Sequence, residues 1–180
     1  MAGLKAKDTE EKSLLQLMDE AALAEKSIGS SQQADLTHQR VRVEIFSRLE
    51  KIGLPDIDQQ HEQLVQYVCN LYKVIAVLRQ GVPSESDKAL FYETVEGLQN
   101  YTVDHFRDEE AYMEKIGYPD LADHQAVHQE FVKKFLTIRK AEQKGEITIA
   151  IDLFFLVYRW LFDHINRVDV SIAQFGKEEQ

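Results

Sequence analysis

Histidines and carboxylates are spaced along this chain in a pattern typical of a metal site shared by several helices. Five of the six histidines fall in four groups: His61, then His105 with Glu109, then His124 with His128, then His164 with Asp169. In two of these groups the members are four residues apart, so they stack on one helix face about a turn apart. Burying such groups from four helices would be costly without a cation. The spacing therefore predicts a site for two metal ions.

Four long segments with apolar residues at helical spacing carry these groups. They run from about Asp58 to Arg79, Ser86 to Ile116, Leu121 to Gln143 and Thr148 to Ala173, with Asp58 expected as the N-cap of the first. Glycine and proline interrupt the pattern at 81–84 and 117–120, and Lys144-Gly145 ends the third segment. Short connections between long helices favour antiparallel neighbours. We therefore predict an all-α fold, an antiparallel up-down-up-down four-helix bundle over residues 51–180.

Residues 1–50 form an N-terminal helical extension in this interpretation. A first amphipathic stretch covers Glu11–Glu25 and ends near Gly29. A second stretch, Ala34–Leu49, places Val41 and Ile45 on one stripe. An apolar stripe must cover something. The sequence leaves open whether it covers the bundle, the same stripe in a homodimer or an output domain.

The alternating direction of the helices brings all four groups to one end of the bundle. His61 and His124 lie early in their segments, whereas His105 and His164 lie late in theirs. Asp169 is the exception, because a residue five positions after His164 is about 140° away around an ideal helix. We expect Asp169 to reach the site from its flank or through a local distortion.

The donor types favour iron. Two six-coordinate metals offer about twelve positions, and five imidazoles, two bridging carboxylates and an oxide or hydroxide bridge fill all but one. Nitrogen-rich ligation suits iron better than magnesium or calcium, and the absence of thiolates argues against structural zinc. The open position would accept a small anion or a reduced oxygen species. Zinc or manganese in place of iron is the alternative.

Composition excludes several classes of function. The formal net charge of -10 would repel nucleic acid and anionic membranes. No apolar run is long enough to span a bilayer, and the N-terminus lacks the apolar core of a secretory signal. The one cysteine, Cys69, excludes an internal disulfide and is expected to be a buried small hydrophobe. We expect a cytoplasmic protein, with His38 and Glu110 as solvated side chains.

The motifs around the metal site resemble the hemerythrin family over roughly residues 52–175. They are Ile57-Asp58-Gln59-Gln60-His61, the block His105-Phe106-Arg107-Asp108-Glu109-Glu110 with Met113, Tyr118-Pro119 followed by His124 and His128, and Trp160-Leu161 followed by His164-Ile165 and Asp169. The resemblance implies a non-haem di-iron centre that binds dioxygen reversibly at one iron. It implies that His124, His128 and His164 hold one iron, that His61 and His105 hold the other, and that Glu109 and Asp169 bridge them.

The resemblance also implies an apolar pocket around the iron ligands and the bound oxygen. The matching residues are Leu64, Phe106, Phe131, Trp160, Leu161 and Ile165. Such a pocket would exclude the water and protons that promote oxidation of the iron. The chain departs from the family in lacking a tryptophan before the first bundle helix, since Trp160 is its only one.

Three functions are compatible with this site. The first is a bacteriohemerythrin-like domain that senses oxygen or redox state, alone or as the sensory part of a signalling protein, with autoxidation to the di-ferric form as the switch. The N-terminal extension favours it over the second, oxygen carriage or storage. The third is a di-iron oxidase or peroxidase. Carboxylate-rich di-iron enzymes use Glu-x-x-His spacing, which this chain lacks, so we do not expect an enzyme.

Overall fold

The described part of the chain is helical. The computed structural model describes residues 31–79, 82–141 and 145–178, and no strand occurs within those ranges. The chain divides into two compact units, Met1–Glu44 and Ile45–Gln180. Helix α2 (Ser31–Ser47) agrees with the second predicted N-terminal stretch. The first predicted stretch, Glu11–Glu25, lies outside the described residues.

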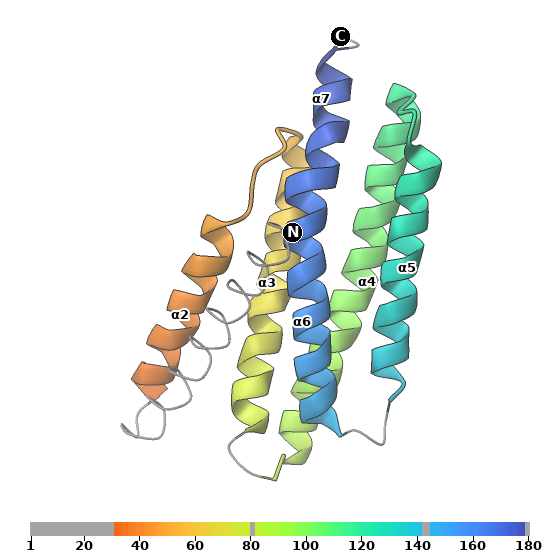
Figure 1. Ribbon diagram of the computed structural model, residues 1–180. Coiled ribbons are helices and arrows are strands. Elements are labelled where there is room, and N and C mark those ends of the chain that lie inside the picture. Colours follow the sequence, from red (N-terminus) through yellow and green to blue (C-terminus); the bar gives the residue numbers. More distant parts are fainter. Residues whose placement is uncertain (1–30, 80–81, 142–144, 179–180) are drawn as a thin grey trace, which may run out of the picture. The chain divides into compact units, whose positions relative to one another are not determined.

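The second unit is built on four long helices that run in alternating directions (Figure 1). They are α3 (Pro55–Leu78), α4 (Glu85–Ile116), α5 (Leu121–Arg139) and α6 (Glu146–His164). A π-helix, η2 (Ile165–Asp169), and α7 (Val170–Glu178) continue the line of α6. Helices α3 and α5 each pack against both α4 and α6. The predicted up-down-up-down bundle is therefore confirmed.

The start of α3 differs from the prediction. The helix begins at Pro55, whose fixed φ suits a first helical position, and its N-cap is Leu54. Asp58 is therefore not the N-cap, and that expectation was wrong. Its carboxylate instead accepts the backbone N–H groups of Ile52 at 2.8 Å and of Gly53 at 3.0 Å. Asp58 thus fixes the segment that leads into α3.

The other helix ends follow local chemistry. Ser84 caps α4 in a capping box with Asp87, in which each side chain accepts a backbone N–H of the other residue. Gly117 ends α4 with a φ of 66°, the left-handed conformation that glycine adopts without strain. Helix α5 ends at Arg139, earlier than the predicted Gln143. These short turns reverse the chain and bring the helices into register.

A continuous apolar core holds the bundle together. Buried side chains recur at helical spacing on the inward faces, among them Leu64, Val68, Leu71, Val95, Leu98, Phe131, Phe135, Leu153, Phe154 and Val157. Cys69 is buried as predicted. No helix in the described ranges combines the length and the apolar character that a membrane span requires. Burial of this apolar surface is the main force that fixes the helices, and with them the polar groups near the bundle's end.

Candidate metal centre

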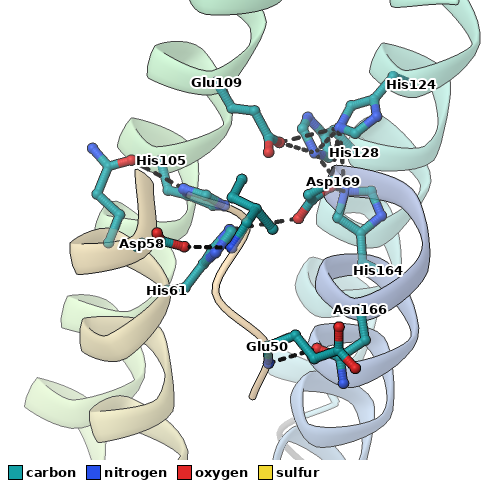
Figure 2. Close-up of polar contacts among 12 residues, drawn as sticks. Glu50, Asp58, His61, His105, Glu109, His124, His128, His164, Asn166 and Asp169 are labelled. Carbon is teal, nitrogen blue, oxygen red and sulfur yellow. Dashed lines mark hydrogen bonds and ion pairs between the residues drawn. The ribbon is translucent and has the colours of Figure 1, made fainter. Parts of the chain in front are cut away.

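Seven polar side chains from the bundle helices meet where α3 and α5 begin and α6 ends (Figure 2). They are His61 from α3, His105 and Glu109 from α4, His124 and His128 from α5, His164 from the end of α6, and Asp169 from η2, and all are at most 4% exposed. These are the seven residues that the sequence pattern singles out. The structure brings all of them together.

Three imidazole nitrogens point at a common centre. Nε2 of His128 lies 3.0 Å from Nε2 of both His124 and His164, and the remaining pair is 3.2 Å apart. Imidazole nitrogens bind divalent metals at about 2.1 Å, and three mutually perpendicular donors at that distance would be about 3.0 Å apart. The observed spacing therefore fits three neighbouring positions of a six-coordinate ion.

The two carboxylates lie between this trio and the other two histidines. Oε2 of Glu109 is 3.1 Å from Nε2 of His124 and 3.3 Å from Nε2 of His128, and Glu109 also groups with His61 and His105. Oδ1 of Asp169 is 3.2 Å from Nε2 of His164, and its Oδ2 is 3.5 Å from Nε2 of His61. Each carboxylate thus reaches both groups, as a bridging ligand must.

Several buried atoms of this cluster have no hydrogen-bond partner among the described residues. They are Nδ1 and Nε2 of His61, Nε2 of His105, Oε1 of Glu109, Nδ1 of His124 and both Oδ atoms of Asp169. A buried polar atom without a partner costs about 1–3 kcal/mol, so such atoms are rare in folded proteins. Most of these atoms face the shared centre (Figure 2). Metal ions are the partners that the donor set fits.

The π-helix places Asp169 on the same side as His164. A π-helix has i→i+5 hydrogen bonds, so residues five positions apart come close to one face, which an α-helix does not allow. Element η2 covers the five residues Ile165–Asp169 and directly follows His164. Of the two routes expected for Asp169, approach from the flank or a local distortion, the structure shows the local distortion.

Burial keeps two of the histidines neutral. The pKa of His105 is lowered to about 3 and that of His164 to about 2, chiefly because burial disfavours the charged imidazolium. Neutral imidazole is the form that binds metals. The fold therefore presents these two side chains in the ligand form at neutral pH.

The two carboxylates respond differently to burial. Burial alone would raise the pKa of Glu109, but the contacts of its carboxylate with His124 and His128 outweigh burial and hold the pKa well below its usual range. Burial and then the charge of Glu109 raise the pKa of Asp169. Burial opposes protonation of His124, but its hydrogen bond with Glu109 raises its pKa overall. The two carboxylates thus lie close enough for the charge of Glu109 to oppose ionisation of Asp169, an opposition that cations between the histidine groups would relieve.

Two residues outside the predicted set orient the histidines. Oε1 of Gln60 accepts a hydrogen bond from Nδ1 of His105 at 3.1 Å, and Oε1 of Glu110 accepts one from Nδ1 of His128 at 2.8 Å. Each bond fixes the tautomer that leaves Nε2 free to face the centre. Glu110 was expected to be only a solvated side chain; it is 26% exposed, but it also pairs with His128. Its position 100° around α4 from Glu109 turns it toward α5, and the sequence alone does not show which helix lies on that side.

Aromatic rings cover the imidazoles on their outer side. Phe106 stacks on His128 with ring centroids 3.7 Å apart, and Trp160 stacks on His164 at 4.1 Å. Phe131 contacts both, at 5.9 Å from Phe106 and 4.5 Å from Trp160. The remaining residues of the expected oxygen pocket, Leu64, Leu161 and Ile165, are at most 1% exposed. Their role in enclosing a ligand stays a prediction.

Comparison with known proteins follows the same residues. The sequence profile of the hemerythrin HHE cation binding domain matches residues 52–172. The chain is 32% identical over 137 residues to a bacteriohemerythrin of Stenotrophomonas maltophilia, an overlap of 72% of this chain and 84% of that protein. It is 33% identical over 119 residues to a bacteriohemerythrin of Pseudomonas aeruginosa, with 66% and 72% of the two chains covered. A myohemerythrin of Theromyzon tessulatum is 32% identical over 92 residues, 51% of this chain and 71% of that protein. The profile match spans every residue of the cluster.

Proposed function

Because this chain belongs to the hemerythrin family, whose domain binds a di-iron centre and dioxygen, we propose that it senses oxygen or redox state through that centre. Two iron ions would supply one open coordination position at which dioxygen binds reversibly. The histidines and carboxylates would hold the iron ions. The chain segment that leads into the bundle would transmit the change at the centre. The observation that carries the sensing role is a contact between that segment and the π-helix.

In this proposal the seven buried side chains are shared between two iron positions, in the grouping that their mutual distances suggest. His124, His128 and His164 hold one iron, and His61 and His105 hold the other. Glu109 and Asp169 bridge the two, which the contacts of each carboxylate with both histidine groups support. Because the second position has one histidine fewer, the open coordination position would belong to it.

The side chains around the ligands would protect a bound oxygen molecule. Leu64, Leu161 and Ile165 are fully buried, and the rings of Phe106, Phe131 and Trp160 close the outer side of the histidines. An apolar enclosure keeps out water and protons, which promote oxidation of the iron. These contacts support binding of oxygen without its chemical conversion, so we propose a binding protein and not an enzyme.

The segment that enters the bundle is attached to η2 by Asn166 (Figure 2). Nδ2 of Asn166 donates to the carbonyl oxygen of Arg48 at 2.8 Å, and its Oδ1 accepts the backbone N–H of Glu50 at 3.0 Å. Asn166 lies within the π-helix between His164 and Asp169. A single side chain therefore joins the incoming chain to the element that carries Asp169 and directly follows His164.

The same segment is attached a second time, next to His61. Asp58 lies one turn before His61 in α3 and binds the backbone N–H groups of Ile52 and Gly53. Residues 48–53 are thus held by two of the elements that carry candidate ligands, α3 and η2. Switches of this kind act by changing charge and bridging at a bistable element. We propose that η2 is that element, and that residues 48–53 pass its change to the N-terminal unit, to a second copy or to an output domain.

A time course and an exchange measurement test the sensing role. We expect the oxygen-dependent absorption bands of the iron-loaded protein to disappear within seconds to minutes in air, and hydrogen exchange at the Glu50 amide to differ between the reduced and oxidised proteins. Asn166→Ala should abolish this difference. Asn70→Ala, which removes a side chain that pairs with Gln66 inside α3, should not. Bands that last for hours, with equal exchange in both states, would support oxygen carriage or storage instead.

We also propose a cytoplasmic location. With Cys69 as its single cysteine, the chain needs no disulfide of its own to fold, which suits a reducing compartment. Two measurements test this location. A fluorescent fusion of the protein is imaged in intact cells, and the cell fraction that contains the protein is identified after lysis.

A further inference from the structure

The two histidine groups differ in what accepts the hydrogen bond from the far side of the imidazole. Behind His128 stands the carboxylate of Glu110, 2.8 Å from Nδ1. Behind His105 stands the amide oxygen of Gln60, 3.1 Å from Nδ1. Both arrangements turn Nε2 toward the centre. A carboxylate, however, carries a full negative charge at neutral pH and an amide carries none.

Glu110 is held firmly in this position. Its second oxygen, Oε2, accepts a hydrogen bond from Nε2 of Gln125 at 3.1 Å, so α5 supplies both of its partners. The side chain is 26% exposed and lines, together with His128, a groove of about 1060 Å³ between α4 and α5. A carboxylate at the wall of such a groove keeps part of its hydration while it contacts a buried imidazole. It therefore avoids the full cost of burying a charge.

The negative charge behind His105 acts more weakly than the charge of Glu110 behind His128, because the neutral amide of Gln60 stands in between. Nε2 of Gln60 donates to Oδ2 of Asp108 at 2.8 Å, so a carboxylate stands one residue further out. Oδ1 of Asp108 also accepts a hydrogen bond from the guanidinium of Arg107 at 3.1 Å, which compensates its charge. The negative charge behind His105 is thus both more distant and partly neutralised. The two sides of the centre are electrostatically unequal.

We propose that Glu110 and Gln60 are positioning residues that make the two metal positions unequal, and this inference rests on the proposed di-iron function. A carboxylate that accepts the Nδ1–H of a ligand histidine raises the basicity of its Nε2, whereas an amide raises it less. The position held by His124, His128 and His164 is then the tighter one, which fills first and favours the more highly charged ion. The position held by His61 and His105 is the weaker one.

Exchange of charge at these two residues tests the inference. Glu110→Gln keeps an acceptor for His128 and removes only the charge. We expect it to weaken the tighter step of an anaerobic ferrous titration roughly 10- to 100-fold, the usual effect of removing such a partner, and to shift the reduction potential of the centre upward. Gln60→Glu should raise the iron affinity of the weaker step and so reduce the difference in affinity between the two steps. Circular dichroism of each metal-free variant verifies the fold.

A matched control lies in the same groove. Glu114 is on α4, one turn beyond Glu110, and lines the groove; within the described part of the chain it makes no hydrogen bond or ion pair with a histidine of the cluster. Glu114→Gln changes the net charge equally and should leave both binding steps and the potential unchanged. If Glu110→Gln behaves like Glu114→Gln, the inference is wrong. If the wild-type protein gives oxygen-dependent bands but two equal binding steps, the inference also fails, although the proposed function stands. A wild-type protein that binds no iron overturns both.

Discussion

Nε2 of His164 and Oδ1 of Asp169 lie 3.2 Å apart, although the two residues are five positions apart in one continuous helical segment. In an α-helix these two side chains would diverge by about 140°, and only the π-helix at Ile165–Asp169 brings them to one face. The π-helix is a less favourable backbone conformation than the α-helix. Its presence next to a buried cluster indicates that the fold accepts a local cost to complete the site.

Removal of the Asp169 charge should have opposite effects on the metal-free and the iron-loaded protein. Asp169 is fully buried, and among the described residues its carboxylate oxygens have close histidine nitrogens but no hydrogen-bond partner. Asp169→Asn should therefore raise the free energy of unfolding of the metal-free protein by about 1–3 kcal/mol. It should lower both the iron content and the stability of the loaded protein. Urea unfolding with and without iron measures both effects.

The control for this prediction is Asp163→Asn, because the side chain of Asp163 is 44% exposed on α6. It should change neither stability by more than about 0.5 kcal/mol. A loss of stability in metal-free Asp169→Asn would contradict the idea that the cluster is unfavourable without a cation.

Loss of His124 should remove the metal. His124 contacts His128, His164 and Glu109 through Nε2, so His124→Ala would delete a donor from the centre of the three-histidine group. We expect iron per chain to fall well below two and the oxygen-dependent absorption bands to vanish. His38→Ala, which changes the one histidine that the sequence pattern leaves out of the four groups, is the control. Full iron loading and unchanged spectra in His124→Ala would show that this ligand assignment is wrong.

Truncation of Leu161 should separate stability from protection of the ligand. Leu161 is 1% exposed in the last turn of α6, so Leu161→Ala should cost about 2–5 kcal/mol of stability. The variant should keep its iron but lose the oxygen-dependent bands several times faster, because water enters the space left by the side chain. Stopped-flow absorption spectroscopy measures this rate.

Leu153→Ala provides the matched comparison, since Leu153 is equally buried on the same helix, three turns before the cluster. It should lose a similar amount of stability without a change in the decay rate. Equal decay rates in the two variants would argue against a protective role for Leu161.

Acid should destabilise the metal-free protein in a defined window. Burial lowers the pKa of His105 to about 3 and of His164 to about 2 from an ordinary value of 6.5. Between pH 6.5 and 5 the unfolded chain therefore binds protons that the folded chain does not. The free energy of unfolding should fall with decreasing pH by up to roughly 1.4 kcal/mol per pH unit for each histidine. Denaturant unfolding at several pH values measures the slope.

His124 does not cancel this effect. Its pKa is raised, so it opposes the effect only near pH 6.5, where the unfolded chain is about half protonated, and its slope fades as the pH falls further. Its stabilising contribution is present below pH 6.5 and is lost as the pH rises through its folded-state pKa. A stability that stays flat from pH 6.5 to 5 would mean that His105 and His164 are not held neutral by the fold.

The bundle and the meeting of the four residue groups could be predicted because both depend on periodic features. Apolar residues at helical spacing define the helices, and short glycine- and proline-containing connections define their antiparallel order. The heights of His61, His105, His124 and His164 along their helices follow from these two facts alone. Their convergence in the structure required no further information.

The features that could not be predicted depend on which way a side chain turns. Asp58 has the residue type of an N-cap, but Pro55 starts the helix earlier and frees that carboxylate to bind the incoming backbone. Glu110 and Gln60 acquire their roles only when a neighbouring helix presents an imidazole Nδ1 to them. The spacing of His164 and Asp169 predicted a flanking approach or a local distortion of the helix. It did not predict that the distortion would be a π-helix.

The attachment of the incoming segment by Asn166 has a consequence for how such bundles can be combined with other sequences. Both of its hydrogen bonds reach main-chain atoms, the carbonyl of Arg48 and the amide of Glu50. Every amino acid offers that carbonyl, and every one except proline offers that amide. Unrelated leading segments could therefore be grafted onto the same bundle, and each would inherit the junction without any matching change on the helices.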